Sequence, residues 1–128
     1  MKLLLDTCTF LWVTKGSEEL SPKAIDAFAD PKNEVCLSAV SAWEINVKYR
    51  LGKLSLPLSP DKFIPKERKR HLITPLDLSE QDTLHLYKLP ATHKDPFDRM
   101  LICQAIEHSL TILTPDPLIT QYPIRTLW

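Results

Sequence analysis

The chain has 128 residues, of which 44% are hydrophobic and 25% are charged, a balance typical of one soluble globular domain over residues 1–128. Sixteen basic residues offset 16 acidic ones, so there is no overall positive field, and binding to a polyanion would need a local patch or a bound cation. The apolar run before Asp6 is too short for a signal peptide or a membrane span, which predicts a cytoplasmic protein with no membrane partner.

Short apolar segments alternate with amphipathic ones along the chain. The expected strands cover residues 2–5, 34–37, 72–76, 110–114 and 124–127. The expected helices cover residues 7–14, 22–29, 39–51, 61–71 (interrupted at Pro65) and 79–88, and a last helix begins at Pro96. Ser21, Ser38 and Ser79 are expected N-caps, and Gly52 closes the third helix. Strands that are apolar on both faces and alternate with helices predict an α/β fold, three layers of α/β/α around a central, mostly parallel sheet.

The three cysteines, Cys8, Cys36 and Cys103, lie in apolar runs. Their odd number and setting predict reduced thiols in the core of a protein from a reducing compartment. No Cys-x-x-Cys or His-x-x-x-His spacing occurs, so a structural zinc site is not expected.

Two acids follow predicted strands, and two more interrupt apolar helix faces. Asp6 and Asp116 come after the strands at 2–5 and 110–114, and the carboxyl ends of parallel strands meet at one rim. At about 100° per residue, Asp98 shares a helix face with the apolar set Leu101, Ile102 and Ala105, whereas Gln104, Glu107 and His108 point away from it.

Glu44 interrupts a similar stripe formed by Val40, Val47 and Leu51. Each helical acid also has a simpler interpretation. Asp98 could complement the positive end of its helix dipole, worth about 0.3–1 kcal/mol, and Glu44 could pair with Lys48 at i, i+4, worth about 0.2–0.5 kcal/mol. Neither explains why both carboxylates face inward, so we expect all four acids to converge.

Converging carboxylates stay ionised only with a cation between them. Oxygen ligands favour Mg²⁺, with Mn²⁺ as the other possibility, and such an ion can activate water for hydrolysis of a phosphodiester. The chain has only two glycines, Gly16 and Gly52, so a glycine-rich phosphate loop is excluded, and neither a Gly-x-Ser-x-Gly elbow nor a Cys–His pair is evident.

Four short motifs in this order resemble those of the PIN-domain ribonucleases of the VapC toxin family. They are Leu3-Leu4-Leu5-Asp6-Thr7; Ser41-Ala42-Trp43-Glu44-Ile45 with Lys48 and Leu51-Gly52-Lys53-Leu54; Asp95-Pro96-Phe97-Asp98-Arg99; and Thr114-Pro115-Asp116. The resemblance spans nearly the whole chain, down to Leu127-Trp128.

The resemblance implies a PIN-like fold and a Mg²⁺-dependent endoribonuclease, usually the toxin of a type II toxin–antitoxin pair, with a VapB-like antitoxin as partner and a homodimer as the expected assembly. The family's acidic positions fall on Asp6, Glu44, Asp98 and Asp116. Cys8, where similar proteins often carry His or Asn, and Pro115, where they often carry Arg, depart from the pattern.

Several other residues are candidates for supporting roles. The hydroxyls of Thr7, Ser38 and Thr114 could orient a carboxylate or a water, Lys48 could pair with Glu44, and Asp95 is a rival ligand that fits the turn before its helix better. A basic cluster could track RNA phosphates or could be a solvated face; it comprises Lys62, Lys66, Arg68, Lys69, Arg70 and His71. Phe10, Trp12 and Trp43 are expected in the core; the alternative is that some of them line a groove for a partner helix.

One alternative stays open at this point, and two others lack residues that they need. A non-catalytic PIN-like module could bind RNA or a protein partner without cleaving. A haloacid-dehalogenase-like phosphatase would need a second Asp where Cys8 stands. A receiver domain would need a second acid beside Asp6 and a distal Lys at a strand end, and neither is evident.

Overall fold

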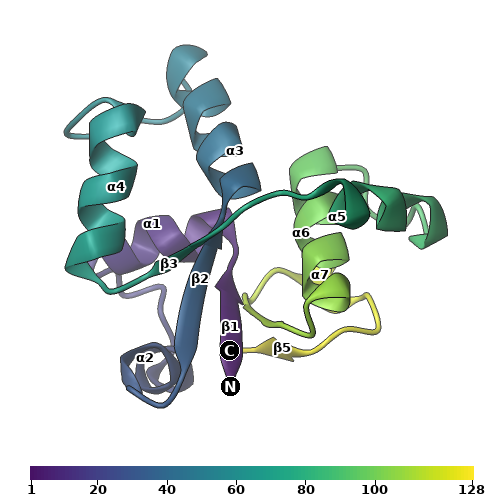
Figure 1. Cartoon of the computed structure of the whole chain (residues 1–128). Coiled ribbons are helices and arrows are strands. Elements are labelled where there is room, and N and C mark those ends of the chain that lie inside the picture. The colour runs from purple at the N-terminus through teal and green to yellow at the C-terminus, as the bar shows by residue number, and fades with distance from the viewer.

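The computed structural model describes residues 1–128 and contains one five-stranded sheet in which every strand pairing is parallel (Figure 1). The strand order is β3-β2-β1-β4-β5, so β1 is central. The strands are β1 Lys2–Leu5, β2 Glu34–Ser38, β3 Thr74–Leu76, β4 Thr111–Leu113 and β5 Thr126–Leu127. The parallel α/β sheet expected from the sequence is confirmed, with the two short strands β3 and β5 at its edges.

Seven α-helices and one 3₁₀ helix connect the strands. They are α1 Thr7–Lys15, α2 Pro22–Ala29, α3 Ala39–Arg50, α4 Pro60–Arg70, α5 Glu80–Leu84, η1 His85–Lys88, α6 Pro96–Glu107 and α7 Pro117–Thr120. Ser21, Ser38 and Ser79 cap α2, α3 and α5 through their hydroxyls, as expected. None of these helices has the length and apolar character needed to cross a membrane.

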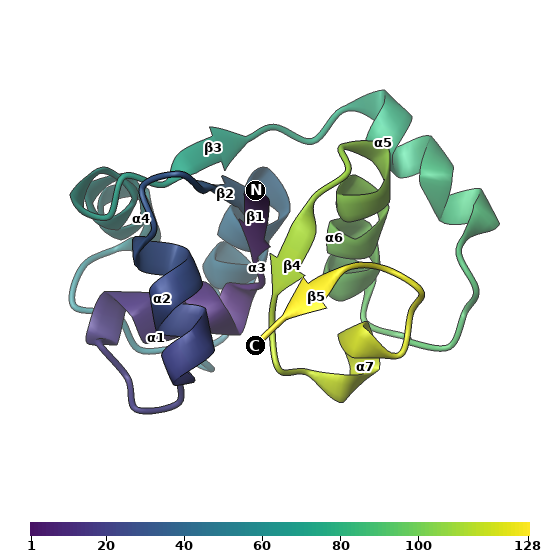
Figure 2. The same ribbon diagram turned by 90° about the horizontal axis from the view of Figure 1, so that it is seen from below.

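The strands bury both faces, which places helices on both sides of the sheet. Leu3 and Leu5 belong to one apolar cluster with Phe10 of α1 and Phe63 of α4, whereas Leu4 belongs to a second cluster with Leu101 of α6. This alternation follows from the two-residue period of a strand. Figures 1 and 2 show α1, α2 and α4 on one side of the sheet and α5, α6 and α7 on the other.

Four elements differ from the expectation. Helix α4 continues through Pro65 instead of breaking there, because a proline removes only one intrahelical bond and the buried Phe63 and Ile64 keep the helix packed against the core. Helix α3 ends at Arg50, with Leu51 as a 63% exposed cap. The segment expected as one helix over 79–88 divides into α5 and η1, and the short α7 was not expected at all.

Three expectations about burial can also be checked. Cys36 and Cys103 are buried free thiols, but Cys8 is exposed, because it lies on the outward face of α1 at the mouth of a cavity. Phe10 is fully buried, whereas Trp43 is 57% exposed and sits edge-on against Phe97, with ring centroids 4.8 Å apart. The assignment of Trp43 to the core is therefore wrong.

Candidate active site

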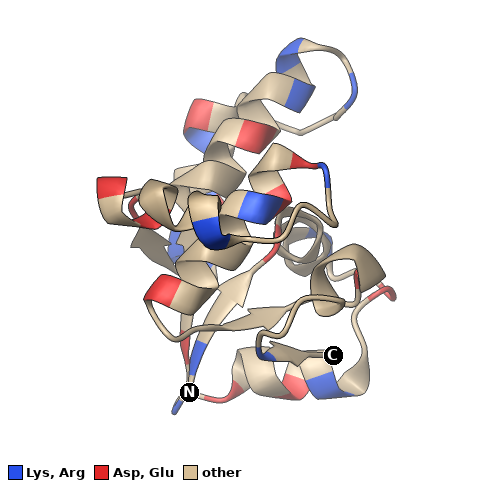
Figure 3. Cartoon of the chain, turned by 90° about the vertical axis from the view of Figure 1, so that its right-hand side faces the viewer, with Lys and Arg blue, Asp and Glu red and all other residues tan.

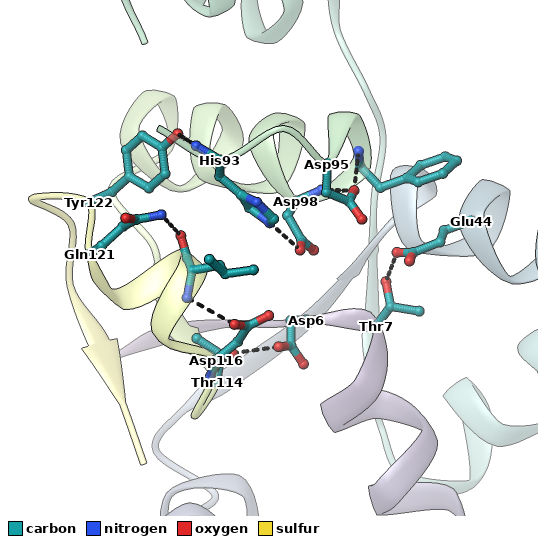
Figure 4. A network of polar contacts seen from close by, with 12 residues as sticks. Asp6, Thr7, Glu44, His93, Asp95, Asp98, Thr114, Asp116, Gln121 and Tyr122 are labelled. Atoms are coloured by element: carbon teal, nitrogen blue, oxygen red, sulfur yellow. Dashed lines mark hydrogen bonds and ion pairs between the residues drawn. The ribbon is translucent and has the colours of Figure 1, made fainter. Parts of the chain in front are cut away.

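The four acids singled out by the sequence line one cavity of about 230 Å³ at the carboxyl end of the central strands. Asp6 follows β1 and Asp116 follows β4, while Glu44 projects from α3 and Asp98 from α6 (Figure 4). The other lining residues are Thr7, Cys8, Lys48, His93, Asp95 and Leu118. The convergence of the acids from four separate elements is the main geometric expectation, and these positions agree with it.

Asp6 is 4% exposed and is held at both carboxylate oxygens. Oδ1 accepts from the backbone N–H of Thr9 at 2.7 Å, and Oδ2 accepts from the hydroxyl of Thr114 at 2.5 Å. The same Thr114 oxygen accepts from the backbone N–H of Asp116 at 3.1 Å. Thr114 therefore ties two of the acids together. Burial raises the pKa of Asp6 above its ordinary value, although these hydrogen bonds oppose the rise.

Glu44 is buried but already has a cationic partner. Its Oε1 accepts from the Thr7 hydroxyl at 2.6 Å, and its Oε2 lies 2.5 Å from Lys48 Nζ. The expected Glu44–Lys48 pair therefore exists. Burial disfavours the charged ammonium, but the hydrogen bond and the charge of Glu44 outweigh it and raise the pKa of Lys48. Because these two opposite charges pair, the side of the cavity formed by α3 is close to electrically neutral.

Asp95 and Asp98 lie three residues apart, and their side chains have different roles. Asp95 caps α6, because its Oδ1 accepts from the backbone N–H groups of Phe97 and Asp98 at 2.9 and 3.1 Å. The Asp98 side chain instead points into the cavity. Burial raises the pKa of Asp98 to about 6; the hydrogen bond from His93 opposes this rise, and the charges of Asp95 and Glu44 add to it.

Asp116 is half-buried and stands at the start of a single turn of helix. Its Oδ1 accepts from the backbone N–H of Leu118 at 2.9 Å, so it caps α7. Pro117 occupies the first helical position, where a missing N–H costs nothing. The cap leaves the other carboxylate oxygen free to face the cavity.

Two groups of expected site residues do not join the cavity. The Ser38 hydroxyl accepts from the N–H of Val40 and donates to Gln104 Oε1, so its single proton is used and it contacts no carboxylate. No residue of α4 lines the cavity, and α4 packs against α3 (Figure 1). A role in RNA contact for Lys66, Arg68, Lys69 and Arg70 stays a prediction.

The structure adds two residues that the sequence pattern did not select. His93 lines the cavity and contacts Asp98, but it precedes the helix, in a loop where no periodicity marks its direction. Gln104 was expected to point away from the core and is fully buried. It donates to Asp82 Oδ2 at 3.2 Å, because α5 covers the side of α6 that a one-sided helix pattern leaves to solvent.

The donors present suit a hard divalent cation. Oxygen is the ligand atom of all four acids, and only one cation, Lys48, lines the cavity against Asp6, Glu44, Asp95, Asp98 and Asp116. No three His, Cys, Asp or Glu side chains are already placed to hold one ion between them. This arrangement fits Mg²⁺, which is commonly held by one or two carboxylates and completes its shell with water.

The Cys8 thiol also lines the cavity, and a cysteine nucleophile is a chemical alternative to a cation. Burial and the charge of Asp6 raise the pKa of Cys8 to about 11. The thiolate is the reactive form of cysteine, so at neutral pH this thiol is protonated and unsuited to nucleophilic attack.

Comparison with known proteins identifies relatives of the whole fold. A family model described as the PIN domain matches residues 3–124. A curated relative, Ribonuclease VapC16 of Mycobacterium tuberculosis, is 41% identical over 56 residues, which is 44% of this chain and 40% of that protein. The aligned part therefore spans about two-fifths of the length of the curated relative.

Solved structures share the fold at low identity. VapBC2 from Rickettsia felis, bound to a promoter DNA fragment, has a TM-score of 0.70 at 16% identity, covering 98% of this chain and 97% of that one. VapBC-1 from nontypeable Haemophilus influenzae has a TM-score of 0.70 at 17% identity, covering 98% and 96%. FitAcB from Neisseria gonorrhoeae has a TM-score of 0.59 at 21% identity, covering 97% and 95%. At these identities the likeness is one of fold.

Proposed function

This chain belongs to the PIN-domain family, which confirms the resemblance seen in its motifs, and on that premise we propose that it is a Mg²⁺-dependent endoribonuclease. The observation that carries the proposal is the convergence of four acids on one cavity: Asp6, Glu44, Asp98 and Asp116. Lys48 is the only lysine or arginine among the residues that line it. Ribonuclease VapC16 is a named ribonuclease among its relatives, which supports RNA as the substrate.

Asp6, Asp98 and Asp116 would bind the hydrated cation, one or two of them directly and the rest through its waters, because they are the acids that lack a basic partner of full charge. A bound Mg²⁺, or Mn²⁺, would supply contact to a phosphate oxygen and a water of lowered pKa. Thr114 holds Asp6 and orders the start of the Asp116 turn. Thr7 and Lys48 hold Glu44, so Glu44 would orient a water at the cation and would not be its main ligand.

The proposal extends to the biological setting. The solved structures of VapBC2, VapBC-1 and FitAcB support a role as the toxin of a type II toxin–antitoxin pair, with a VapB-like antitoxin as partner, a homodimer as the assembly, and the cytoplasm as the location. Expression of the chain in bacteria should arrest growth, and expression of Glu44→Gln should not. Growth arrest by both would show that toxicity comes from something other than this site.

The direct test of the reaction is cleavage of labelled single-stranded RNA by the purified chain in Mg²⁺, Mn²⁺ or EDTA. We expect cleavage with either ion, none in EDTA, and a loss of several orders of magnitude in Asp6→Asn and Glu44→Gln. Variants purified in parallel control for contaminating nuclease. If RNA binds but is not cut under any of these conditions, the chain is a non-catalytic PIN-like module and the proposal is wrong.

A further inference from the structure

His93 lies in the wall of the acidic cavity, is 7% exposed, and places its Nε2 2.8 Å from Asp98 Oδ2 (Figure 4). We propose that His93 is a positioning residue that holds the Asp98 carboxylate toward the cation, and that the hydroxyl of Tyr122 in turn fixes His93. The inference rests on the proposed function for its catalytic meaning. Its geometric part, that His93 acts through Asp98, can be tested by cation binding alone.

Asp98 is the only one of the four acids that is held by a single side chain, since the one partner of Asp116 is the backbone N–H of Leu118. Two hydrogen bonds hold the Asp6 carboxylate, and both Thr7 and Lys48 hold Glu44. His93 is the only group that hydrogen-bonds to the Asp98 side chain. Because an ionised carboxylate only accepts, Nε2 carries the proton in this contact. Without it, no other hydrogen bond fixes the rotamer of Asp98.

Tyr122 fixes the loop that presents His93. The backbone N–H of His93 donates to Tyr122 Oη at 3.0 Å, and Tyr122 Oη donates to the carbonyl oxygen of Pro90 at 2.8 Å. One buried hydroxyl, on a side chain only 3% exposed, therefore holds both ends of residues 90–93. Tyr122 lies two residues after α7, the helix that Asp116 caps. The chain Tyr122–His93–Asp98 thus couples the segments that present two of the four acids.

Groups that orient a metal-binding side chain without touching the metal typically change affinity or activity by about 10- to 100-fold when removed. The expected result for His93→Ala is therefore a loss of that size in Mn²⁺ affinity, measured by calorimetry on the full chain, and in kcat. The KM for RNA should stay close to the wild-type value, because His93 is only 7% exposed and its Nε2 is engaged by Asp98. His85→Ala is the matched control, since His85 pairs with Glu107 away from the cavity.

A conservative variant separates positioning from loop stability. The amide nitrogen of a glutamine reaches about as far as Nε2 and donates a proton, so His93→Gln should restore most of the Mn²⁺ affinity lost in His93→Ala. Tyr122→Phe, which removes only the hydroxyl, should also weaken Mn²⁺ binding, but by less than His93→Ala does. Thermal melts of all variants identify any that fail to fold.

The decisive comparison is a double-mutant cycle with Asp98→Asn. If His93 acts only through Asp98, adding His93→Ala to Asp98→Asn leaves the Mn²⁺ affinity unchanged, because the group that His93 positions is already lost. Additive losses would mean that His93 binds the cation or another ligand directly, and they would overturn the inference. Failure of His93→Gln to restore affinity would also overturn it. If the wild-type chain binds Mn²⁺ but cuts no RNA, the proposed function fails while this cycle still decides the role of His93.

Discussion

At the scale of single residues, the hydrogen-bond partners of a buried carboxylate decide the direction in which its pKa moves. Asp82 and Asp98 are both acids in contact with a histidine. Burial opposes ionisation of Asp82, yet hydrogen bonds from Ser79, Gln104 and His108 hold its pKa below the usual range. Asp98 has one such partner, and burial takes its pKa to about 6. Asp82 therefore has several hydrogen-bond donors that stabilise its ionised form, whereas Asp98 has only one.

The metal-free protein should therefore become more stable as the pH falls from 7 to 5. The pKa of Asp98 rises from 3.8 to about 6 on folding, so between these values the folded state binds more protons than the unfolded state, and stability falls as pH rises. Asp98→Asn should remove much of this dependence and melt at the same temperature as the wild type, or a few degrees higher, at pH 7 in EDTA. Thermal melts at both pH values measure the effect. A variant that melts clearly below the wild type at pH 7 would contradict it.

Asp95→Asn is the matched control, because it makes the same chemical change three residues away. Asparagine is also a good N-cap, so this variant should keep most of the RNA cleavage, whereas Asp95→Ala should lose about 0.5–2 kcal/mol of stability. If Asp95→Asn is inactive while Asp98→Asn is active, Asp95 and not Asp98 is the acid of the site.

The contact between Thr7 and Glu44 predicts a stability effect. Thr7→Val keeps the shape of the side chain and removes the hydroxyl that donates to a buried carboxylate at 2.6 Å. Hydrogen bonds to charged groups contribute about 1.5–3 kcal/mol, and urea unfolding should show a loss of that size. Thr14→Val on the same helix is the control, because its hydroxyl donates only to the carbonyl oxygen of Leu11. Equal behaviour of the two variants would show that Glu44 does not need Thr7.

At the scale of helices and strands, local chemistry predicted most of the boundaries. Helix starts could be found because Ser21, Ser38 and Ser79 are residues that accept from the first free N–H groups of a helix. The acids of the site could be found for a related reason, since a carboxylate in phase with buried aliphatic residues is unusual.

What the sequence did not predict depends on contacts between elements. Helix α7 is one turn long, and no periodic pattern exists over four residues. The burial of Gln104, the exposure of Trp43 and the direction of His93 follow from how α3, α5 and α6 pack, which a pattern along one helix does not contain. A helix covered on two sides has two buried faces, whereas the apolar stripe of α6 predicts only one.

Gln104 gives a prediction at this scale, because it bridges β2, α5 and α6. It accepts from Ser38 and donates to Asp82 and to the carbonyl oxygen of Asp77. Gln104→Met keeps the volume and leaves these groups unpaired, which should lower the stability by about 1–3 kcal/mol. Gln104→Glu should lose more at pH 7 than at pH 5, since it places a second carboxylate against Asp82. Gln81→Met, at an exposed position of α5, is the control for urea unfolding.

At the scale of the whole molecule, the balanced charge is also spread out. Lys and Arg positions occur on several elements between Asp and Glu positions (Figure 3). Helix α4 still carries the densest basic run, but Arg70 pairs with Glu67 at 3.3 Å and Arg68 is half-buried in a groove beside Ile64. Its exposed lysines are therefore the part of the cluster that is free to contact RNA.

If these lysines track phosphates, replacing Lys62, Lys66 and Lys69 together by alanine should weaken RNA binding and reduce its dependence on salt. Each phosphate contact on single-stranded nucleic acid contributes about 0.7 to the slope of log K against log salt, so the slope should fall by up to about 2. Replacing Lys15, Lys23 and Lys32, exposed lysines elsewhere, makes the same change in net charge. Equal slopes for the two triple variants would show that the lysines of α4 are solvated and do not contact RNA.

The central claim is that four carboxylates from four elements form a site for a hard divalent cation. The most direct measurement is the melting temperature of the metal-free chain as Mg²⁺, Mn²⁺ or Zn²⁺ is added. An ion that binds only the folded state stabilises it by about 2.7 kcal/mol at 100 times its Kd, so Mg²⁺ and Mn²⁺ should each raise the melting temperature of the wild type by several degrees. The same ions should have little effect on the Asp6→Asn, Asp98→Asn double variant. No rise with Mg²⁺ or Mn²⁺, together with a rise with Zn²⁺ alone, would contradict the oxygen-ligand site.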